Sequence, residues 1–257
     1  MKLKVMTYNI ASCRNYEQVD EKGNAFCTKP ERVADVIREI SPDICGLNEV
    51  SHFDKNETLA DKQTDYLAEK TGLSNGFFGF AKHITYSNLP ANNKDYGNAV
   101  ISKHPIISSE IVPIPDPVIK DENAYYETRS ITKVKLDVAG GITVLQTHMG
   151  LAIAESKNAT LELCKIIDNT DGPIILMGDF NIRPSNPLID ILREKLFDTA
   201  LIREDYFKTF PSYDLKYTPC KIDYIFVSKH FKTLSLEIPQ TSVSDHLPYY
   251  VELEIGE

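Results

Sequence analysis

Long hydrophobic runs and tryptophan are missing from this sequence of 257 residues. Its longest apolar stretches, such as residues 174–177, are far shorter than the roughly 20 residues that cross a bilayer, which argues against a membrane-spanning helix. The N-terminus has two lysines but no apolar segment and no small-residue cleavage site. We therefore expect a first strand there and no secretory signal.

Paired cysteines are also missing. No C-x-x-C motif occurs, which argues against a zinc ribbon, and an odd number of cysteines does not fit a disulfide framework. We therefore expect reduced thiols and a cytoplasmic protein. The five cysteines are Cys13, Cys27, Cys45, Cys164 and Cys220.

Two nucleotide-binding signatures are absent, because the sequence has neither a Gly-rich P-loop nor a G-x-G-x-x-G motif. Positive charge is scarce as well: 28 Lys and Arg stand against 37 Asp and Glu, a net charge of −9. This balance argues against an extended basic groove for nucleic acid, which depends on clustered cations. It does not exclude an enzyme that holds phosphate through a metal ion.

What is present is typical of a globular chain of one or two domains, with 42% hydrophobic and 25% charged residues. Hydrophobic patterning predicts an α/β fold in which strands outnumber helices. The predicted strands cover residues 3–10, 44–50, 98–102, 130–138, 142–148, 174–178, 222–227 and 249–253.

Four helices are predicted from periodicity and from helix-start signals. The first starts at the capping-box spacing of Thr28-Lys29-Pro30-Glu31 and ends near Ser41. The others run from about 58 to 72, from roughly 155 to 167, and onward from Ser185-Asn186-Pro187. Residues 79–96 and 111–126 show little periodicity, so we expect long surface loops there.

The strand patterns are of two kinds. Residues 132–138 alternate apolar and polar side chains, which fits an antiparallel strand, whereas residues 173–177 are apolar throughout and are expected to lie in the centre of a sheet. Two mixed sheets packed face to face, with helices outside, satisfy both patterns.

Acidic, amide and imidazole residues gather at or beside the ends of the predicted strands. A hydrophobic strand that ends on a carboxylate must pair that charge or place it in a cleft, because an unpaired buried charge costs several kcal/mol or more. Repetition of this pattern at six strand ends favours a cleft. The residues are Asn9, Glu49, His148, Asp179 with Asn181, Asp223, and Asp245 with His246.

These residue types also restrict the chemistry. The carboxylate and amide oxygens of Asn9, Glu49 and Asp245 suit Mg²⁺ or Mn²⁺, whereas zinc is disfavoured because no H-E-x-x-H motif or thiolate cluster is present. Two histidines with carboxylates available to orient them match the needs of phosphoryl transfer, namely charge stabilisation and proton transfer to the leaving oxygen.

Seven short segments carry these and neighbouring residues along the chain: residues 6–10, 47–50, 97–102, 147–148, 178–181, 222–225 and 244–248. In this order they resemble the motifs of the endonuclease/exonuclease/phosphatase superfamily, which includes folds like deoxyribonuclease I and exonuclease III. The resemblance runs from residue 3 to residue 253. It implies a single catalytic domain over residues 1–257, folded as a four-layer α/β sandwich of two mixed, mostly antiparallel β-sheets with helices outside.

The resemblance implies a role for each site residue. Glu49 would be the main metal ligand, with Asn9 and Asp245 positioning the Mg²⁺ or Mn²⁺ ion or its waters. Asp179 would orient and activate the attacking water.

The remaining site residues would act on the phosphoryl group. Asn181 and His246 would bind the scissile phosphoryl oxygens, His148 would add a second imidazole, and Asp223 would hold His246 in the useful tautomer.

Three residues of a looser flanking motif are substrate-side candidates. Glu127 is a candidate to orient His148, and Arg129 is a candidate to contact phosphate through its guanidinium. Tyr126, in the pair Tyr125-Tyr126, is the best aromatic candidate for a contact with substrate.

The sequence thus predicts a Mg²⁺- or Mn²⁺-dependent hydrolase of phosphate esters that uses in-line attack by water. A small or lipid-like substrate is favoured by the net charge of −9, the lack of a Lys/Arg-rich loop and the lack of tryptophan as a stacking wedge. The alternative is a nuclease acting on DNA or RNA, so a nucleic-acid partner is possible but not favoured. A non-catalytic binding module is a third interpretation, and no protein partner is inferred.

Overall fold

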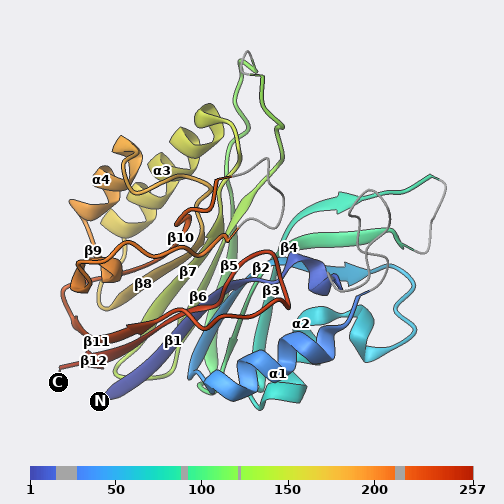
Figure 1. Ribbon diagram of the computed structural model, residues 1–257, viewed down its shortest axis with the longest axis horizontal. Coiled ribbons are helices and arrows are strands. Elements are labelled where there is room, and N and C mark those ends of the chain that lie inside the picture. The colour runs from blue at the N-terminus through green and yellow to red at the C-terminus, as the bar shows by residue number, and fades with distance from the viewer. Residues whose placement is uncertain (16–27, 88–91, 121–122, 212–217, 257) are drawn as a thin grey trace.

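The computed structural model describes residues 1–15, 28–87, 92–120, 123–211 and 218–256. These residues form two six-stranded sheets (Figure 1). The first has the order β11 (Phe231–Glu237), β12 (Tyr249–Ile255), β1 (Lys2–Asn9), β2 (Ile44–Phe53), β4 (Lys94–Ser102), β3 (Asn75–Ile84). The second has the order β5 (Ile106–Pro113), β6 (Ser130–Leu136), β7 (Ile142–His148), β8 (Ile174–Asp179), β10 (Asp223–Val227), β9 (Phe197–Asp198).

Each sheet contains one parallel pair among antiparallel neighbours. β1 runs parallel to β2, and β7 runs parallel to β8. A helix connects the strands of each pair, as parallel pairing requires: α1 (Pro30–Ile40) follows β1, and α3 (Ile153–Asp168) follows β7. The two sheets are therefore mixed and mostly antiparallel, as predicted.

Helices cover both outer faces of the sheet pair. Figure 1 shows α1 and α2 (Gln63–Thr71) on one side, and α3 and α4 (Pro187–Arg193) on the other. Short 3₁₀ turns occur at Ala11–Cys13, Leu59–Asp61 and Thr199–Ile202. The order of layers is helix, sheet, sheet, helix, which confirms the predicted four-layer sandwich.

Three hydrophobic cores fill the spaces between these layers. Val5 and Val100 from the first sheet pack with Val144 and Ile175 from the second, all fully buried. A second core lies under α3 and α4, and a third lies under α1 and α2. Burial of each such aliphatic side chain contributes about 1.5–3 kcal/mol, so the sheet-to-sheet contact is strongly favoured.

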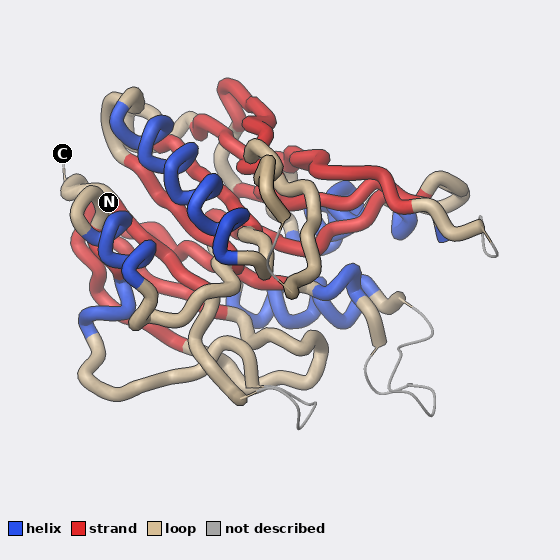
Figure 2. Tube along the Cα trace, turned by 90° about the horizontal axis from the view of Figure 1, so that it is seen from above, coloured by secondary structure: helices blue, strands red, loops and turns tan. Residues whose placement is uncertain are grey.

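Residues 79–96 are not one long loop, and that prediction was wrong. Residues 79–84 belong to β3 and residues 94–96 to β4, and the two strands pair antiparallel as a hairpin that extends away from the helices (Figures 1 and 2). β3 contains two glycines and a Lys-His pair, so it lacks an apolar alternation that the sequence would reveal. Of residues 111–126, the first three belong to β5, an edge strand that is mostly exposed, while 114–120 and 123–126 form no helix or strand.

The predicted helices are present, with two local corrections. α1 begins at Pro30 after Lys29, which makes no side-chain cap, so Thr28 does not cap it. The helix predicted from 58 to 72 is split, because a capping box formed by Thr58 and Asp61 closes a 3₁₀ turn before α2 starts.

The thiols of Cys13, Cys45, Cys164 and Cys220 are free, whereas Cys27 lies outside the described residues. Burial raises the pKa of the Cys13 and Cys45 thiols, which keeps both thiols protonated. Within the described part of the chain, no helix is long and apolar enough to cross a membrane. The cytoplasmic location stays a prediction.

Candidate active site

The two parallel strand pairs bring their carboxyl ends to one region. In the first sheet, Asn9 at the end of β1 pairs with Asn48 of β2, and Glu49 is the next residue of β2. In the second sheet, His148 at the end of β7 pairs with Asp179 at the end of β8. The Asn9 Nδ2 donates to Asp179 Oδ2 at 3.0 Å and to Glu49 Oε1 at 3.3 Å. One amide thus joins the polar ends of both sheets.

Two residues of this region have strained backbone conformations. Glu49 and Asn181 have φ values of 57° and 54°, a region that non-glycine residues rarely adopt. Glu49 sits in an irregularity of β2 between Leu47 and Val50, which redirects its side chain. Such conformations cost about 1–3 kcal/mol each and occur mainly at functional sites, where the surrounding structure holds them.

Gly178, directly before Asp179, has a related constraint. Its φ is 142°, and a Cβ at this position would lie 1.9 Å from the carbonyl oxygen of Thr147. Only glycine therefore allows β8 to approach β7 closely enough to place Asp179 beside His148.

Asp179 lies between two imidazoles. Its Oδ2 is 3.5 Å from His148 Nε2 and 3.5 Å from His246 Nε2. On the far side of His246, Nδ1 is 2.9 Å from Asp223 Oδ2. Each of these four residues exposes at most 5% of its surface, so their charges interact with little screening.

The surroundings shift the protonation of this group. Burial raises the pKa of Asp179 to about 7, although the nearby His246 acts in the opposite direction. Burial lowers the pKa of His246, but the combined charge of Asp223 and Asp179 outweighs it and raises that pKa well above its usual value. His246 is therefore a cation at neutral pH, and Asp179 titrates near neutrality, as suits a residue that exchanges protons with water.

The pKa of His148 shifts in the opposite direction from that of His246. Burial first, and then the charges of Arg129 and His246, lower its pKa well below the usual value. Arg129 Nη1 lies 2.9 Å from His148 Nδ1. Because a guanidinium only donates, Nδ1 must accept, and the proton of the neutral ring is on Nε2, which faces Asp179.

Arg129 thus takes the position beside His148 for which Glu127 was the candidate. The Glu127 carboxylate instead forms ion pairs with Arg129 and Lys82. Its backbone N–H donates to Glu155 Oε1 at 2.7 Å, which anchors the loop before β6 to the start of α3.

Tyr126, the third substrate-side candidate, is partly buried. The Lys120 Nζ lies 5.4 Å from the centroid of its ring. Its contact with substrate stays a prediction.

Asn181 follows β8 and belongs to the same group of polar side chains around Asp179. Its backbone N–H donates to Asp179 Oδ1 at 2.9 Å, and its side-chain Nδ2 donates to the carbonyl of Met149 at 2.9 Å. The amide is thereby fixed between the segments that follow β7 and β8, close to both Asp179 and His148.

The donors of the predicted metal site fit a hard cation. Glu49 is partly exposed, with Oε1 against Asn9 and Oε2 3.2 Å from Arg14 Nη2. Asp245 is partly exposed, next to Ser244, whose Oγ donates to the carbonyl of Asn9 at 2.7 Å. Because Asn9 Oδ1 accepts from the N–H of Ala11, the Asn9 amide is fixed with its Nδ2 toward Glu49 and Asp179. Carboxylate oxygens of this kind are the ligands that Mg²⁺ and Mn²⁺ prefer.

Two supporting residues were not predicted. Asn48 is fully buried and accepts from Asp179 N and Gln146 Nε2, which ties the first sheet to the second. Its signal is a polar side chain within an apolar strand. Thr209 Oγ1 accepts from the N–H groups of Ile222 and Asp223 and so fixes the start of β10, but nothing in its sequence surroundings indicates this role.

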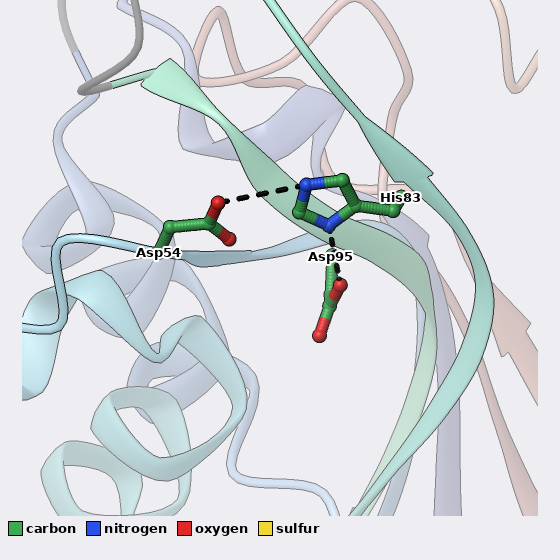
Figure 3. A group of neighbouring side chains, drawn as sticks. All are labelled: Asp54, His83 and Asp95. Atoms are coloured by element: carbon green, nitrogen blue, oxygen red, sulfur yellow. Dashed lines mark hydrogen bonds and ion pairs between the residues drawn. The ribbon is translucent and has the colours of Figure 1, made fainter.

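A separate His–Asp group lies on the β3–β4 hairpin. His83 Nδ1 is 2.8 Å from Asp95 Oδ1, and Nε2 is 3.5 Å from Asp54 Oδ2. Figure 3 shows the imidazole between the two carboxylates, which approach opposite ring nitrogens. This arrangement, here called the clasp, links the imidazole on β3 to one carboxylate on β4 and to another directly after β2.

Comparisons with known proteins agree with this fold. The sequence model described as "Endonuclease/Exonuclease/phosphatase family" matches residues 6–246. A search of curated proteins finds no match. An endonuclease/exonuclease/phosphatase from Beutenbergia cavernae has a similar structure, with a TM-score of 0.77 and 25% identity, covering 99% of this chain and 72% of that one.

Two further solved structures share the fold. The Bacteroides thetaiotaomicron mannosyl-6-phosphatase has a TM-score of 0.66 and 19% identity, covering 98% of this chain and 100% of that one. The human Nocturnin catalytic domain with bound sulfate has a TM-score of 0.65 and 17% identity, covering 99% and 95%. With the family match over residues 6–246, the conclusion follows that this chain belongs to the endonuclease/exonuclease/phosphatase family.

Proposed function

We propose that the chain acts as one catalytic domain that hydrolyses small phosphate esters with the help of Mg²⁺ or Mn²⁺. Members of this family are generally phosphoester hydrolases. The observation that carries the proposal is the buried group in which Asp179 lies 3.5 Å from a neutral His148 and 3.5 Å from a cationic His246.

The buried group supplies the parts of an in-line hydrolysis. Asp179 orients the attacking water and accepts its proton, which a carboxylate with a pKa of about 7 does effectively at neutral pH. The Nε2–H of His148 and the amide of Asn181 donate hydrogen bonds to the phosphoryl oxygens. His246, held by Asp223, offsets the charge that develops in the transition state.

The metal completes this chemistry. Glu49 and Asp245 would hold the Mg²⁺ or Mn²⁺ ion, with Asn9 orienting the Glu49 carboxylate, and the ion would polarise a phosphoryl oxygen. Hydrolysis by a domain without these ions is not expected, because the phosphate charge would then face the carboxylates of Glu49 and Asp245 directly.

A small substrate is favoured over nucleic acid by charge. The chain has a net charge of −9, and a protein that follows a nucleic-acid backbone usually needs an extended basic surface. The similar mannosyl-6-phosphatase structure is named for a small sugar phosphate. Nuclease activity is the competing function, and the substrate panel described next distinguishes it from hydrolysis of small esters.

The test is a substrate panel with Mg²⁺ or Mn²⁺: bis(4-nitrophenyl) phosphate, small phosphate monoesters, sphingomyelin, RNA and plasmid DNA. We expect turnover of small esters, with a loss of about 10²–10⁴ in kcat for Asp179→Asn. Asp35→Asn, at an exposed position on α1, is the matched control and should retain activity. Cleavage of DNA alone, with a steep salt dependence, would favour the nuclease, and no turnover of any substrate would contradict hydrolysis.

A further inference from the structure

The turn that follows β1 has three consecutive residues in strained conformations. Ala11, Ser12 and Cys13 have φ values of 46°, 57° and 56°, and each is at most 1% exposed. The turn is tied to the candidate metal site, because the N–H of Ala11 donates to Asn9 Oδ1 at 3.0 Å. Such a run of non-glycine residues persists only where neighbouring groups hold the backbone in place.

A further strained residue lies on the neighbouring strand. Glu49 has a φ of 57° and lies in the irregularity of β2. The regular pairing of β1 with β2 ends at Asn9 and Asn48, so the ladder between these two strands holds neither the turn 11–13 nor residues 49–51. Other contacts must therefore fix the backbone on both sides of the candidate metal site.

The side-chain amide of Gln63 joins these two segments. Its Nε2 donates to the carbonyl of Ser12 at 2.7 Å, and its Oε1 accepts from the N–H of Ser51 at 2.8 Å. Because a carbonyl only accepts and an N–H only donates, the amide satisfies both partners in this orientation alone. Gln63 is fully buried, so water does not replace either hydrogen bond.

Gln63 is itself held by a packed helix. It is the first residue of α2, which packs against the first sheet in the third hydrophobic core. Ser12 has two further partners, since the Oγ of Ser51 and the Nζ of Lys94 donate to its Oγ at 2.9 Å and 3.2 Å. The strained turn is thus connected to α2, β2 and β4 through one residue.

The partners of Gln63 lie close in sequence to two residues of the candidate metal site. Ser51 follows Glu49 by two residues, and Ser12 follows Asn9 by three. Asn9 Nδ2 also donates to Glu49 Oε1 at 3.3 Å. Without the amide bridge, the backbone at Glu49 would be free to relax toward an ordinary strand conformation, which would carry the carboxylate away from Asn9.

We propose that Gln63 is a positioning residue for the metal ion. Its amide holds the two strained segments that place Glu49 and Asn9, although Gln63 itself provides no ligand. This inference rests on the proposed function, because Glu49 is a metal ligand only within it. It adds a residue of α2, away from the strand ends, to the groups on which metal binding depends.

The experiment measures Mn²⁺ binding to the metal-free protein from the EPR signal of the free ion, so it does not depend on turnover. Gln63→Met keeps the length of the side chain but loses both hydrogen bonds. We expect its Mn²⁺ Kd to rise about tenfold, the size of effect that follows the loss of a group that orients a metal ligand. Circular dichroism checks that the variant is folded.

Gln63→Glu is the conservative variant. A protonated carboxyl group presents one acceptor and one donor, as the amide does. At pH 6, where burial favours the protonated form, Gln63→Glu should therefore restore most of the affinity that Gln63→Met loses. If Gln63→Met does not fold, Gln63→Asn, whose shorter side chain cannot reach both partners, takes its place in this comparison.

Ser228→Ala is the matched control. Ser228 is buried, its Oγ accepts from the N–H of Ile174 at 2.9 Å, and Ile174 begins β8 at the end opposite Asp179. Loss of a buried hydrogen bond there should leave the Mn²⁺ Kd unchanged. An unchanged Kd in Gln63→Met, no rescue by Gln63→Glu, or the same loss in Ser228→Ala would overturn the positioning role.

The wild-type protein separates this role from the proposed function. Absence of Mn²⁺ binding in wild type would overturn both. Mn²⁺ binding without hydrolysis of bis(4-nitrophenyl) phosphate would count against the proposed function alone, and the Kd values of the variants would still decide the role of Gln63.

Discussion

At the scale of residues, the two site histidines show how neighbours decide protonation. Both rings are buried, and burial alone disfavours their charge. His246 faces Asp223 and Asp179 and is charged, whereas His148 faces Arg129 and is neutral. One imidazole thus offers positive charge and the other a hydrogen-bond donor, which are different contributions to a phosphate site.

Asn48 gives a residue-scale prediction about stability. Its Oδ1 accepts from Asp179 N at 3.0 Å and from Gln146 Nε2 at 2.8 Å, and both donors are buried. Asn48→Ala leaves these donors without a partner, which costs about 1–3 kcal/mol each. We expect the free energy of unfolding, measured with urea, to fall by about 2–5 kcal/mol. Asn75→Ala is the control, because its amide makes only 3.3 Å contacts near the surface; an equal loss in both variants would contradict this role.

At the scale of elements, the β3–β4 hairpin is held at its outer end by the clasp of His83 with Asp54 and Asp95. The hydrogen bond to Asp95 raises the pKa of His83, and Asp54 acts in the same direction. A raised pKa in the folded state means that the clasp stabilises the protein below the usual histidine pKa and loses this effect as pH rises through the raised value.

The clasp therefore predicts a pH dependence. Wild type should melt at a higher temperature than His83→Asn at pH 5.5, and the difference should disappear by pH 8.5. The His83 pKa itself is read from NMR titration and should drop in Asp95→Asn. A difference in melting temperature that is constant across this range would show that the clasp does not depend on charge.

At the scale of the whole molecule, the proposed metal ion would join Glu49 and Asp245, which lie far apart in the chain. Saturating Mg²⁺ should raise the melting temperature of wild type by about 5 °C, since a ligand at one hundred times its Kd contributes about 2.7 kcal/mol. Chelation should abolish both this shift and hydrolysis, and Mn²⁺ should restore them. Glu49→Gln should lose the shift in melting temperature, whereas Glu39→Gln on α1 should keep it. Hydrolysis that persists in excess chelator would contradict the requirement for a metal ion.

The sequence predicted the interior of both sheets well and their edges poorly. The eight predicted strands are interior strands, and their continuous or alternating apolar residues reflect burial on one or both faces. The missed strands β3, β5, β9 and β11 are the four edges of the two sheets. An edge strand has a partner on one side only and buries less surface, so its apolar pattern is weak.

In the candidate site, too, the residues that follow a local strand pattern were predicted and the contacts between elements were not. Asn9, His148 and Asp179 were found because each ends an interior strand whose pattern is local. Glu49 was found because the predicted strand stopped beside it, although β2 continues to Phe53. The contact of Arg129 with His148 and the position of Lys94 beside Ser12 depend on packing between elements, and no sequence spacing encodes them.

The pairing of β1 with β12 has a consequence for the time at which the enzyme becomes competent. Residues 2–7 of β1 lie beside residues 249–254, and the turn that carries His246 leads directly into β12. A ribosome that has synthesised β1 must therefore complete more than two hundred further residues before that strand gains its second neighbour. Closing such distant contacts is slow, so refolding protein should recover hydrolysis only in its last kinetic phase, after most of its secondary structure has formed.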